Sequence, residues 1–251
     1  MIHYHGLPIT PNSSALEAIK VGHAFVSFIY PAQLGLAISV CQSFAIDNGA
    51  FTLWKQGKST NNWVKYYKFA LECKRYPSCD FAIIPDVIDG TEKENDLLVK
   101  EWPLGNWFGV PVWHMNESFE RLEKLSSDFR IVCIGSSGEY KVVGTSKWWS
   151  RMTQIMDVIC DNDGYPKVKL HGLRMLNPEI FTRIPFSSVD STNIGRNIGI
   201  DSHWTGSYTP PSKDCRSMVM RSRIESHNAP SKWVIENIPK GKKEKRLKLW
   251  S

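Results

Sequence analysis

Short apolar runs alternate along the chain with longer stretches in which apolar residues recur at helical spacing. The runs are rich in β-branched and aromatic side chains, which is typical of buried strands. They lie at Ala24–Phe28, Ser43–Ile46, Phe81–Ile84, Val110–Trp113, Ile131–Ile134, Val168–Leu170 and Phe186–Val189. An eighth strand is expected either at Trp233–Glu236 or within Val219–Ile224.

The intervening stretches predict amphipathic helices. One helical face holds Trp63, Tyr66, Tyr67, Ala70 and Leu71, and a second holds Trp148, Met152, Ile155, Met156 and Ile159. A shorter helix is expected over Glu117–Leu125, with Asn116 as its N-cap. Alternation of strand and helix indicates a parallel sheet, and this number of units favours a closed (β/α)8 TIM barrel over an open, doubly wound sheet. No glycine-rich dinucleotide fingerprint follows the first run, which also argues against a Rossmann fold.

The 251-residue chain is long enough for one such barrel. We expect a single TIM-barrel domain over residues 1–239. Within it, residues 198–231 are rich in Gly, Ser, Pro and His and show little periodicity, which predicts an irregular excursion. Residues 240–251 form a basic C-terminal tail.

Composition narrows the functional classes only slightly. The net charge of +6 permits a polyanionic partner such as a nucleic acid. None of the six cysteines are paired at two-residue spacing, so they predict neither a zinc knuckle nor a disulfide framework, and reduced thiols fit a cytoplasmic protein. No apolar stretch is long enough to span a membrane, and the N-terminal residues lack the pattern of a signal peptide, so we expect no membrane partner.

Polar residues that could take part in catalysis or ligand binding follow the apolar runs directly. They are Asp47, Asp86, His114, the loop Gly135–Glu139, His171 and Asp190. In a TIM barrel the carboxyl ends of the strands form the active-site rim, so these residues should converge there. A single aspartate at a strand end is commonly a helix cap or turn former, and each histidine could equally serve packing. Three carboxylates on one rim repel one another, however, and that cost is usually kept for function.

Four segments at these strand ends resemble a known family in order and spacing. They are Asp47–Phe51, Asp80–Asp86, Ile134–Glu139 and Ser188–Asn197. Together, over about Ser43 to Asn197, the chain resembles the tRNA-guanine transglycosylases. It is more similar to their shorter phage and bacterial relatives, which insert 7-deazaguanines into DNA.

The resemblance implies a role for each candidate residue. Asp190 would be the nucleophile, and Asp47 would contact the base and transfer a proton. Asp86 would bind the guanine edge, and the main chain of the loop after the fifth strand would also hold the base. The remaining implied or candidate base-binding positions are His114, Gly135, Ser136, Ser137, Asn48, Gly49, Phe51 and His171.

Basic residues near the C-terminus are candidates for holding nucleic-acid phosphates. The positions are Arg196, Asn197, Lys213, Arg216, Arg221, Arg223, Lys242, Lys243 and Lys245. Trp204 and Tyr208 could stack bases. The alternative for the tail is a disordered, solubilising end.

The predicted function is exchange of guanine in DNA for a 7-deazaguanine such as 7-cyano-7-deazaguanine, without a cofactor. The base would have to be flipped or single-stranded to reach the site, and accessory proteins could assist. A tRNA enzyme with the same chemistry is the nearest alternative, but the family's Cys-x-Cys-x-x-Cys zinc motif is missing and the chain is short. Other classes are a metal-dependent hydrolase using Asp47, Asp86 and His114, and a non-catalytic nucleic-acid binder. The sequence leaves the oligomeric state open.

Overall fold

A single parallel sheet forms the centre of the molecule. The computed structural model describes residues 1–58, 62–201 and 210–239. The strand segments are β1 (Ile2–Leu7), β2 (His23–Ser27), β3 (Ser43–Asp47), β4 (Cys79–Ile83), β5 (Gly109–Val110), β6 (Val112–His114), β7 (Ile131–Gly135), β8 (Lys169–Gly172) and β9 (Ser188–Ser191). Their order in the sheet is β5-β4-β3-β2-β1-β9-β8-β7-β6, and every pair is parallel.

The two outermost segments, β5 and β6, are halves of one strand interrupted at Pro111. The amide of Ile84 donates to the carbonyl of Val110 at 2.9 Å, and the amide of Cys133 donates to the carbonyl of Pro111 at 2.9 Å. The carbonyls of the adjacent residues Val110 and Pro111 therefore accept hydrogen bonds from the two neighbouring strands, one on each side. Proline can take part in this way although it has no N–H to donate. The sheet thus closes into a barrel of the TIM type, and the predicted fold class is confirmed.

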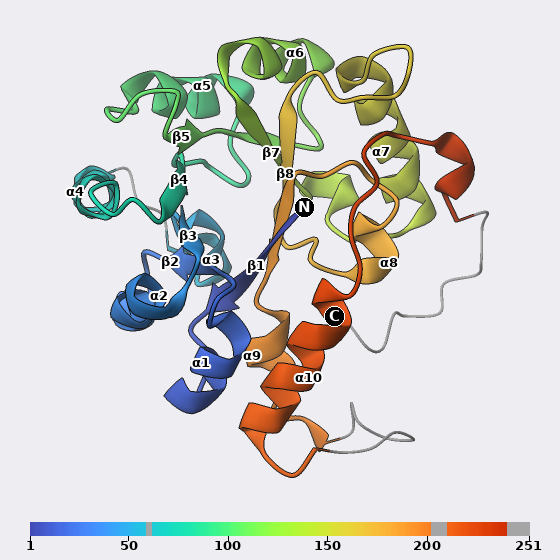
Figure 1. Cartoon of the computed structure of the whole chain (residues 1–251). Coiled ribbons are helices and arrows are strands. Elements are labelled where there is room, and N and C mark those ends of the chain that lie inside the picture. The colour runs from blue at the N-terminus through green and yellow to red at the C-terminus, as the bar shows by residue number, and fades with distance from the viewer. Residues whose placement is uncertain (59–61, 202–209, 240–251) are drawn as a thin grey trace.

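Helices lie around the outside of the strands (Figure 1). They are α1 (Asn12–Ile19), α2 (Leu34–Val40), α3 (Ala50–Lys55), α4 (Val64–Cys73), α5 (Glu92–Glu101), α6 (Phe119–Asp128), α7 (Ser146–Ile159), α8 (Pro178–Phe181), α9 (Asn193–Asn197) and α10 (Lys213–Glu225), with short 3-10 turns at Pro31–Gln33, Gly138–Tyr140 and Ile235–Asn237. The predicted helices at α4 and α7 are confirmed. No helix within the described ranges is long and apolar enough to cross a membrane.

The missing eighth strand is β1, so its expected place near the C-terminus was wrong. This strand has no continuous apolar run, so the sequence pattern did not predict it. Histidines occupy the alternate positions, on the face that turns outward. His3 Nε2 lies 3.0 Å from the carbonyl oxygen of His227, and His5 Nε2 lies 3.0 Å from Glu225 Oε1. Because each histidine has a polar partner outside the strand, its side chain can be removed from solvent at little cost.

Two further expectations need correction. The helix α6 begins at Phe119, and Ser118 is its cap: the Ser118 hydroxyl accepts from the amide of Arg121 at 3.3 Å. Asn116 instead accepts a hydrogen bond from the hydroxyl of Ser137 at 2.5 Å. The reason is Glu117, whose side chain turns inward and keeps residues 114–117 in a turn before the helix.

The region 198–231 is not irregular throughout, because it contains α10. Figure 1 shows α10 lying beside α1, so two helices that are far apart in the sequence pack together. The Ser217 hydroxyl donates to the carbonyl of Ser14 at 2.8 Å, and Met220 and Ile224 are buried on the same side. Only a few apolar residues mark the buried face of this polar helix, so the sequence pattern did not reveal it. The proposed strand at Val219–Ile224 is part of this helix.

The barrel interior is packed with side chains from alternate strand positions. It contains Tyr4, Phe25, Ala45, Phe81, Ile83, Val110, Val112, Ile131 and Cys133. The larger apolar cluster lies between the outer surface of the strands and the helices. Such filling closes the inside of the barrel and leaves the strand ends and their loops as the place for a site.

The docking of α10 predicts a matched pair of stability effects. Ile224 is fully buried, so Ile224→Ala should lower the free energy of unfolding by about 2–4 kcal/mol through lost contacts and a cavity. Met218 on the same helix is 47% exposed, and Met218→Ala should change it by less than about 0.5 kcal/mol. Urea denaturation followed by tryptophan fluorescence measures both. Equal effects of the two substitutions would contradict the docking.

Candidate active site

Three carboxylates meet at the C-terminal end of the barrel. Asp47 is the last residue of β3, Asp190 lies in β9, and Asp86 follows β4. Both Asp190 and Asp86 act electrostatically on Asp47, and all three act on the thiol of Cys133, which is buried in β7. The structure therefore places these side chains around one point of the rim.

Asp190 is held by two neighbours through a single oxygen. Its Oδ1 accepts a hydrogen bond from the backbone N–H of Arg174 at 2.8 Å and lies 3.3 Å from Nε2 of His171. The other ring nitrogen of His171 lies 2.8 Å from the hydroxyl of Ser188. His171 is completely buried among the aromatic side chains of the barrel. Its position therefore suits orienting Asp190 more than contacting a ligand directly.

Asp47 titrates near neutral pH. Burial raises the pKa of its carboxyl from the usual 3.8 to about 7, with further contributions from the charges of Asp190 and Asp86. Hydrogen bonds from the backbone of Gly49 and the hydroxyl of Ser27 oppose the rise. At neutral pH both protonation states are populated, which is the property of an efficient general acid and base.

Asp86 lies between a histidine and an amide. Its Oδ2 is 3.0 Å from Nε2 of His114, and its Oδ1 accepts a hydrogen bond from Nδ2 of Asn48 at 2.8 Å. Burial alone would lower the pKa of His114, but the hydrogen bond to Asp86 and its charge, with that of Glu117, raise it above the usual 6.5. The same Asn48 amide donates to the carbonyl of Ile84 at 2.9 Å, which ties the β3 and β4 loops together.

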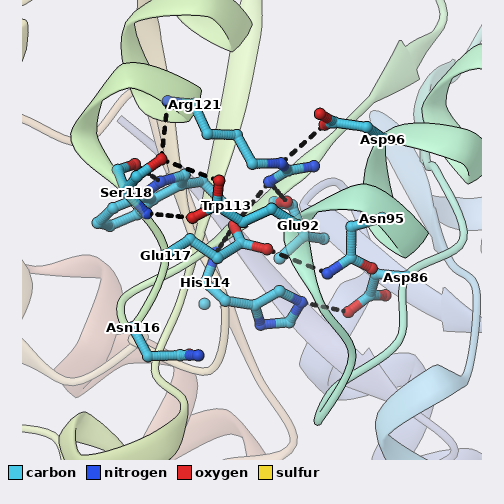
Figure 2. Close-up of polar contacts among 12 residues, drawn as sticks. Asp86, Glu92, Asn95, Asp96, Trp113, His114, Asn116, Glu117, Ser118 and Arg121 are labelled. Carbon is cyan, nitrogen blue, oxygen red and sulfur yellow. Dashed lines mark hydrogen bonds and ion pairs between the residues drawn. The ribbon is translucent and has the colours of Figure 1, made fainter.

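A buried polar network supports His114 from behind (Figure 2). Glu117 Oε2 accepts from the backbone N–H of His114 at 2.9 Å and from Nη1 of Arg121 at 2.6 Å, and its Oε1 accepts from Nδ2 of Asn95 at 3.0 Å. Arg121 also donates to Asp96 on α5 at 2.8 Å. The sequence pattern did not predict this network, although the i, i+4 spacing of Glu117 and Arg121 is a signal for such a pair.

The end of β7 and the loop after it are held in place by one side-chain and one main-chain hydrogen bond. The Ser136 hydroxyl accepts a hydrogen bond from Nε1 of Trp148 at 2.9 Å, and the carbonyl of Gly135 accepts from the amide of Met115 at 2.9 Å. Both Ser136 and Ser137 are buried. On the opposite side of the mouth, Gly49 has φ of 81°, and a Cβ there would lie 2.3 Å from Ile29, so only glycine fits.

Arg174, just past β8, was not among the predicted site residues. Its guanidinium carbon lies 3.8 Å from the ring centre of Phe51, and its Nη2 donates to the carbonyl of Ser136 at 3.3 Å. Asp190, Asp47 and Asp86 all act electrostatically on this guanidinium. The only sequence signal was its place near the end of a strand, which it shares with many residues.

Among the described residues, two of the predicted phosphate-binding arginines have acidic partners. Arg216 pairs with Asp201 at 2.7 Å, and Arg221 pairs with Glu225 at 3.0 Å. Arg221 also packs on Gly22, which directly precedes β2, so it lies toward the other end of the barrel. Arg221 Nη1 donates to the carbonyl of Lys20 at 2.6 Å and Arg216 Nη1 to the carbonyl of Ile198 at 3.0 Å, so both arginines join α10 to other segments.

The other basic candidates divide into described and undescribed positions. Arg196, Lys213 and Arg223 are exposed, whereas Asn197 is buried and donates to the carbonyl of Asn193 at 2.9 Å. Lys242, Lys243, Lys245, Trp204 and Tyr208 lie outside the described residues.

Metal binding was one of the alternatives from sequence. In the part of the chain that the structure describes, no group of three or more His, Cys, Asp or Glu side chains is placed to hold a metal ion.

Comparison with known proteins adds no family. No protein-family model matches the chain, and no curated protein matches it significantly.

The raised pKa of Asp47 predicts a pH-dependent stability. Because the folded state favours the protonated carboxyl, this stabilisation is present below about pH 4 and is lost as the pH rises through about 7. At pH 8 the free energy of unfolding of Asp47→Asn, measured by urea denaturation, should therefore exceed that of the wild type by roughly 2–4 kcal/mol. Near pH 4.5 the difference should be much smaller. The exposed Asp157→Asn serves as the control. A difference that does not vary with pH would contradict this assignment.

The buried network predicts a large cost for removing its cation. Arg121→Met leaves the buried carboxylate of Glu117 without its partner and should lower the free energy of unfolding by about 3–5 kcal/mol. The matched control is Arg75→Met, because Arg75 and its partner Glu72 are both exposed, and it should cost less than about 1 kcal/mol. Thermal or urea unfolding of both variants measures the effect, and a cost for Arg121→Met no greater than that for Arg75→Met would be inconsistent with the network.

Proposed function

We propose that this protein is a base-exchange transglycosylase that replaces guanine in DNA with a 7-deazaguanine. The single observation that carries the proposal is the meeting of Asp47, Asp86 and Asp190 at one end of the barrel. Each of the three steps of base exchange needs a carboxyl group: covalent capture of the sugar, proton transfer, and recognition of the purine edge.

Asp190 is the proposed nucleophile. As the C1′–N9 bond breaks, the sugar develops positive charge, and a carboxylate oxygen of Asp190 forms a bond to C1′. The bonding electrons leave with guanine. The hydrogen bond from the Arg174 amide and the contact with His171 both involve Oδ1, so they fix the orientation of the carboxylate.

Asp47 is the proposed acid and base. In the first half of the reaction the protonated carboxyl gives its proton to the departing guanine. In the second half, N9 of the incoming base attacks C1′, the bond to Asp190 breaks, and the ionised Asp47 takes the N9 proton. A pKa of about 7 suits both halves, since the same group must give and then accept a proton near neutral pH.

Asp86 is the proposed recognition group. A carboxylate matches the N1–H and N2 amino group of guanine, and the 7-deazaguanines present the same edge. Asn48 and His114 hold the two oxygens of Asp86 and thereby orient it. The buried main chain at Ser136 and Ser137 lies in the loop assigned to the base, and Phe51 offers a ring for stacking.

DNA is the proposed macromolecular substrate, and tRNA is the rival with the same chemistry. The absence of the zinc motif from these 251 residues supports DNA. A base within a duplex cannot reach the rim, so it must be flipped or presented in a single strand, at a cost of a few kcal/mol.

Isotope exchange tests the proposal directly. The protein is incubated with DNA or with tRNA and labelled 7-cyano-7-deazaguanine, and the polymer is then digested to nucleosides. Label in DNA nucleosides is expected. Label in tRNA alone would mean that the substrate is tRNA and that the proposed reaction is correct. No label in either polymer would overturn the proposal.

Asp190→Asn should reduce exchange by at least about a thousandfold, because the amide cannot form the covalent intermediate. The wild type incubated with DNA alone should also yield a denaturant-resistant protein–DNA adduct that the variant lacks. Asp157→Asn, which changes an exposed aspartate on α7, is the control and should exchange normally. Wild-type exchange by Asp190→Asn, in a variant with an unchanged circular dichroism spectrum, would refute the role of Asp190.

A further inference from the structure

Arg174 spans the mouth of the barrel from one loop to two others. It follows β8, its guanidinium lies over Phe51 on α3, and its Nη2 donates to the carbonyl of Ser136 after β7. Its backbone N–H meanwhile holds Oδ1 of Asp190. One residue thus contacts groups on three of the elements that form the site.

The position of this guanidinium conflicts with a bound base. At 3.8 Å from the ring centre it covers a face of Phe51, and the Ser136 carbonyl belongs to the loop that the proposed function assigns to the purine. A purine and a guanidinium cannot occupy the same ring face. When a base stacks on that face, the guanidinium must move elsewhere.

Electrostatics indicates where it would go. A nucleotide whose C1′ meets Asp190 brings a phosphodiester on either side, close to three carboxylates that repel it. A cation beside Asp190 is therefore needed. The guanidinium of Arg174 lies within electrostatic range of all three carboxylates and of the cation of Arg196. Arg196 is exposed on α9, which begins directly after the strand that carries Asp190.

The backbone at Arg174 allows the side chain to move alone. Its φ of 59° lies in the left-handed region, which residues other than glycine, asparagine and aspartate seldom adopt. Strain of this kind is commonly retained at functional sites. Because the amide stays bonded to Asp190, the long side chain can swing without disturbing the nucleophile.

We propose that Arg174 and Arg196 form a phosphodiester subsite beside Asp190, and that the Arg174 guanidinium passes from Phe51 to the phosphate as the base enters. This inference rests on the proposed function. It assigns to Arg174 two opposite effects: it competes with a free base for Phe51, and it attracts the nucleic-acid backbone. A bidentate guanidinium suits a phosphate oxygen pair.

Two binding measurements separate these effects. A fluorescein-labelled single-stranded oligonucleotide with one guanine is titrated at several NaCl concentrations by anisotropy, and free 7-cyano-7-deazaguanine is titrated by calorimetry. Arg174→Gln should weaken oligonucleotide binding about 5–10-fold and reduce the slope of log K against log [NaCl] by about 0.7, the loss of one phosphate contact. Binding of the free base should be as tight as in the wild type or tighter.

Matched variants complete the design. Arg174→Lys keeps the charge and should restore the salt slope. Lys169→Gln removes an exposed cation at the opposite end of the same strand and should change neither measurement. Unchanged oligonucleotide affinity and slope in Arg174→Gln would overturn the subsite, as would equal weakening of the free base, because Arg174 would then be a base contact.

The same experiments separate failure of the phosphodiester subsite from failure of the proposed transglycosylase function. If the wild type exchanges no base but Arg174→Gln still loses one phosphate contact, the subsite stands and the transglycosylase proposal falls. If the wild type exchanges bases and Arg174→Gln binds both probes as the wild type does, only the subsite falls.

Discussion

The mutual repulsion of three carboxylates at one end of a barrel is the constraint on which the site depends. Asp47, Asp86 and Asp190 are brought together because parallel strands all end at the same rim. Burial is the main cause of the raised pKa of Asp47, and the charges of Asp190 and Asp86 add to the rise. The surrounding groups are arranged to limit this cost.

Each carboxylate has its own set of donors, and these come from different elements. Asp86 has Asn48 and His114, Asp190 has the amide of Arg174 and the ring of His171, and Asp47 has Gly49 and Ser27. Asp47 titrates near neutral pH, while Asp86 and Asp190 are held in orientation by their donors, an arrangement that suits the proposed base exchange.

Support for this rim extends well behind the residues that would touch a substrate. Glu117 and Arg121 hold the chain at His114 and join α6 to α5, so the position of Asp86 depends on a buried ion pair on the outer side of the barrel (Figure 2). At the other side, α10 contacts the outward His5 of β1 and packs against α1. The barrel therefore relies on polar contacts outside its apolar core, and these contacts connect stability with the geometry of the site.

The sequence by itself determined the fold class and the strand ends from which the carboxylates project, because strand periodicity and the residue that follows each strand are local properties. It did not reveal β1 or α10, whose polar faces are buried only because His5 meets Glu225 and Ser217 meets Ser14. The place of Arg174 over Phe51 and the pairing of His171 with Asp190 were also decided by tertiary structure. These contacts join residues far apart in the chain, so the closing of the barrel creates them and no local pattern encodes them.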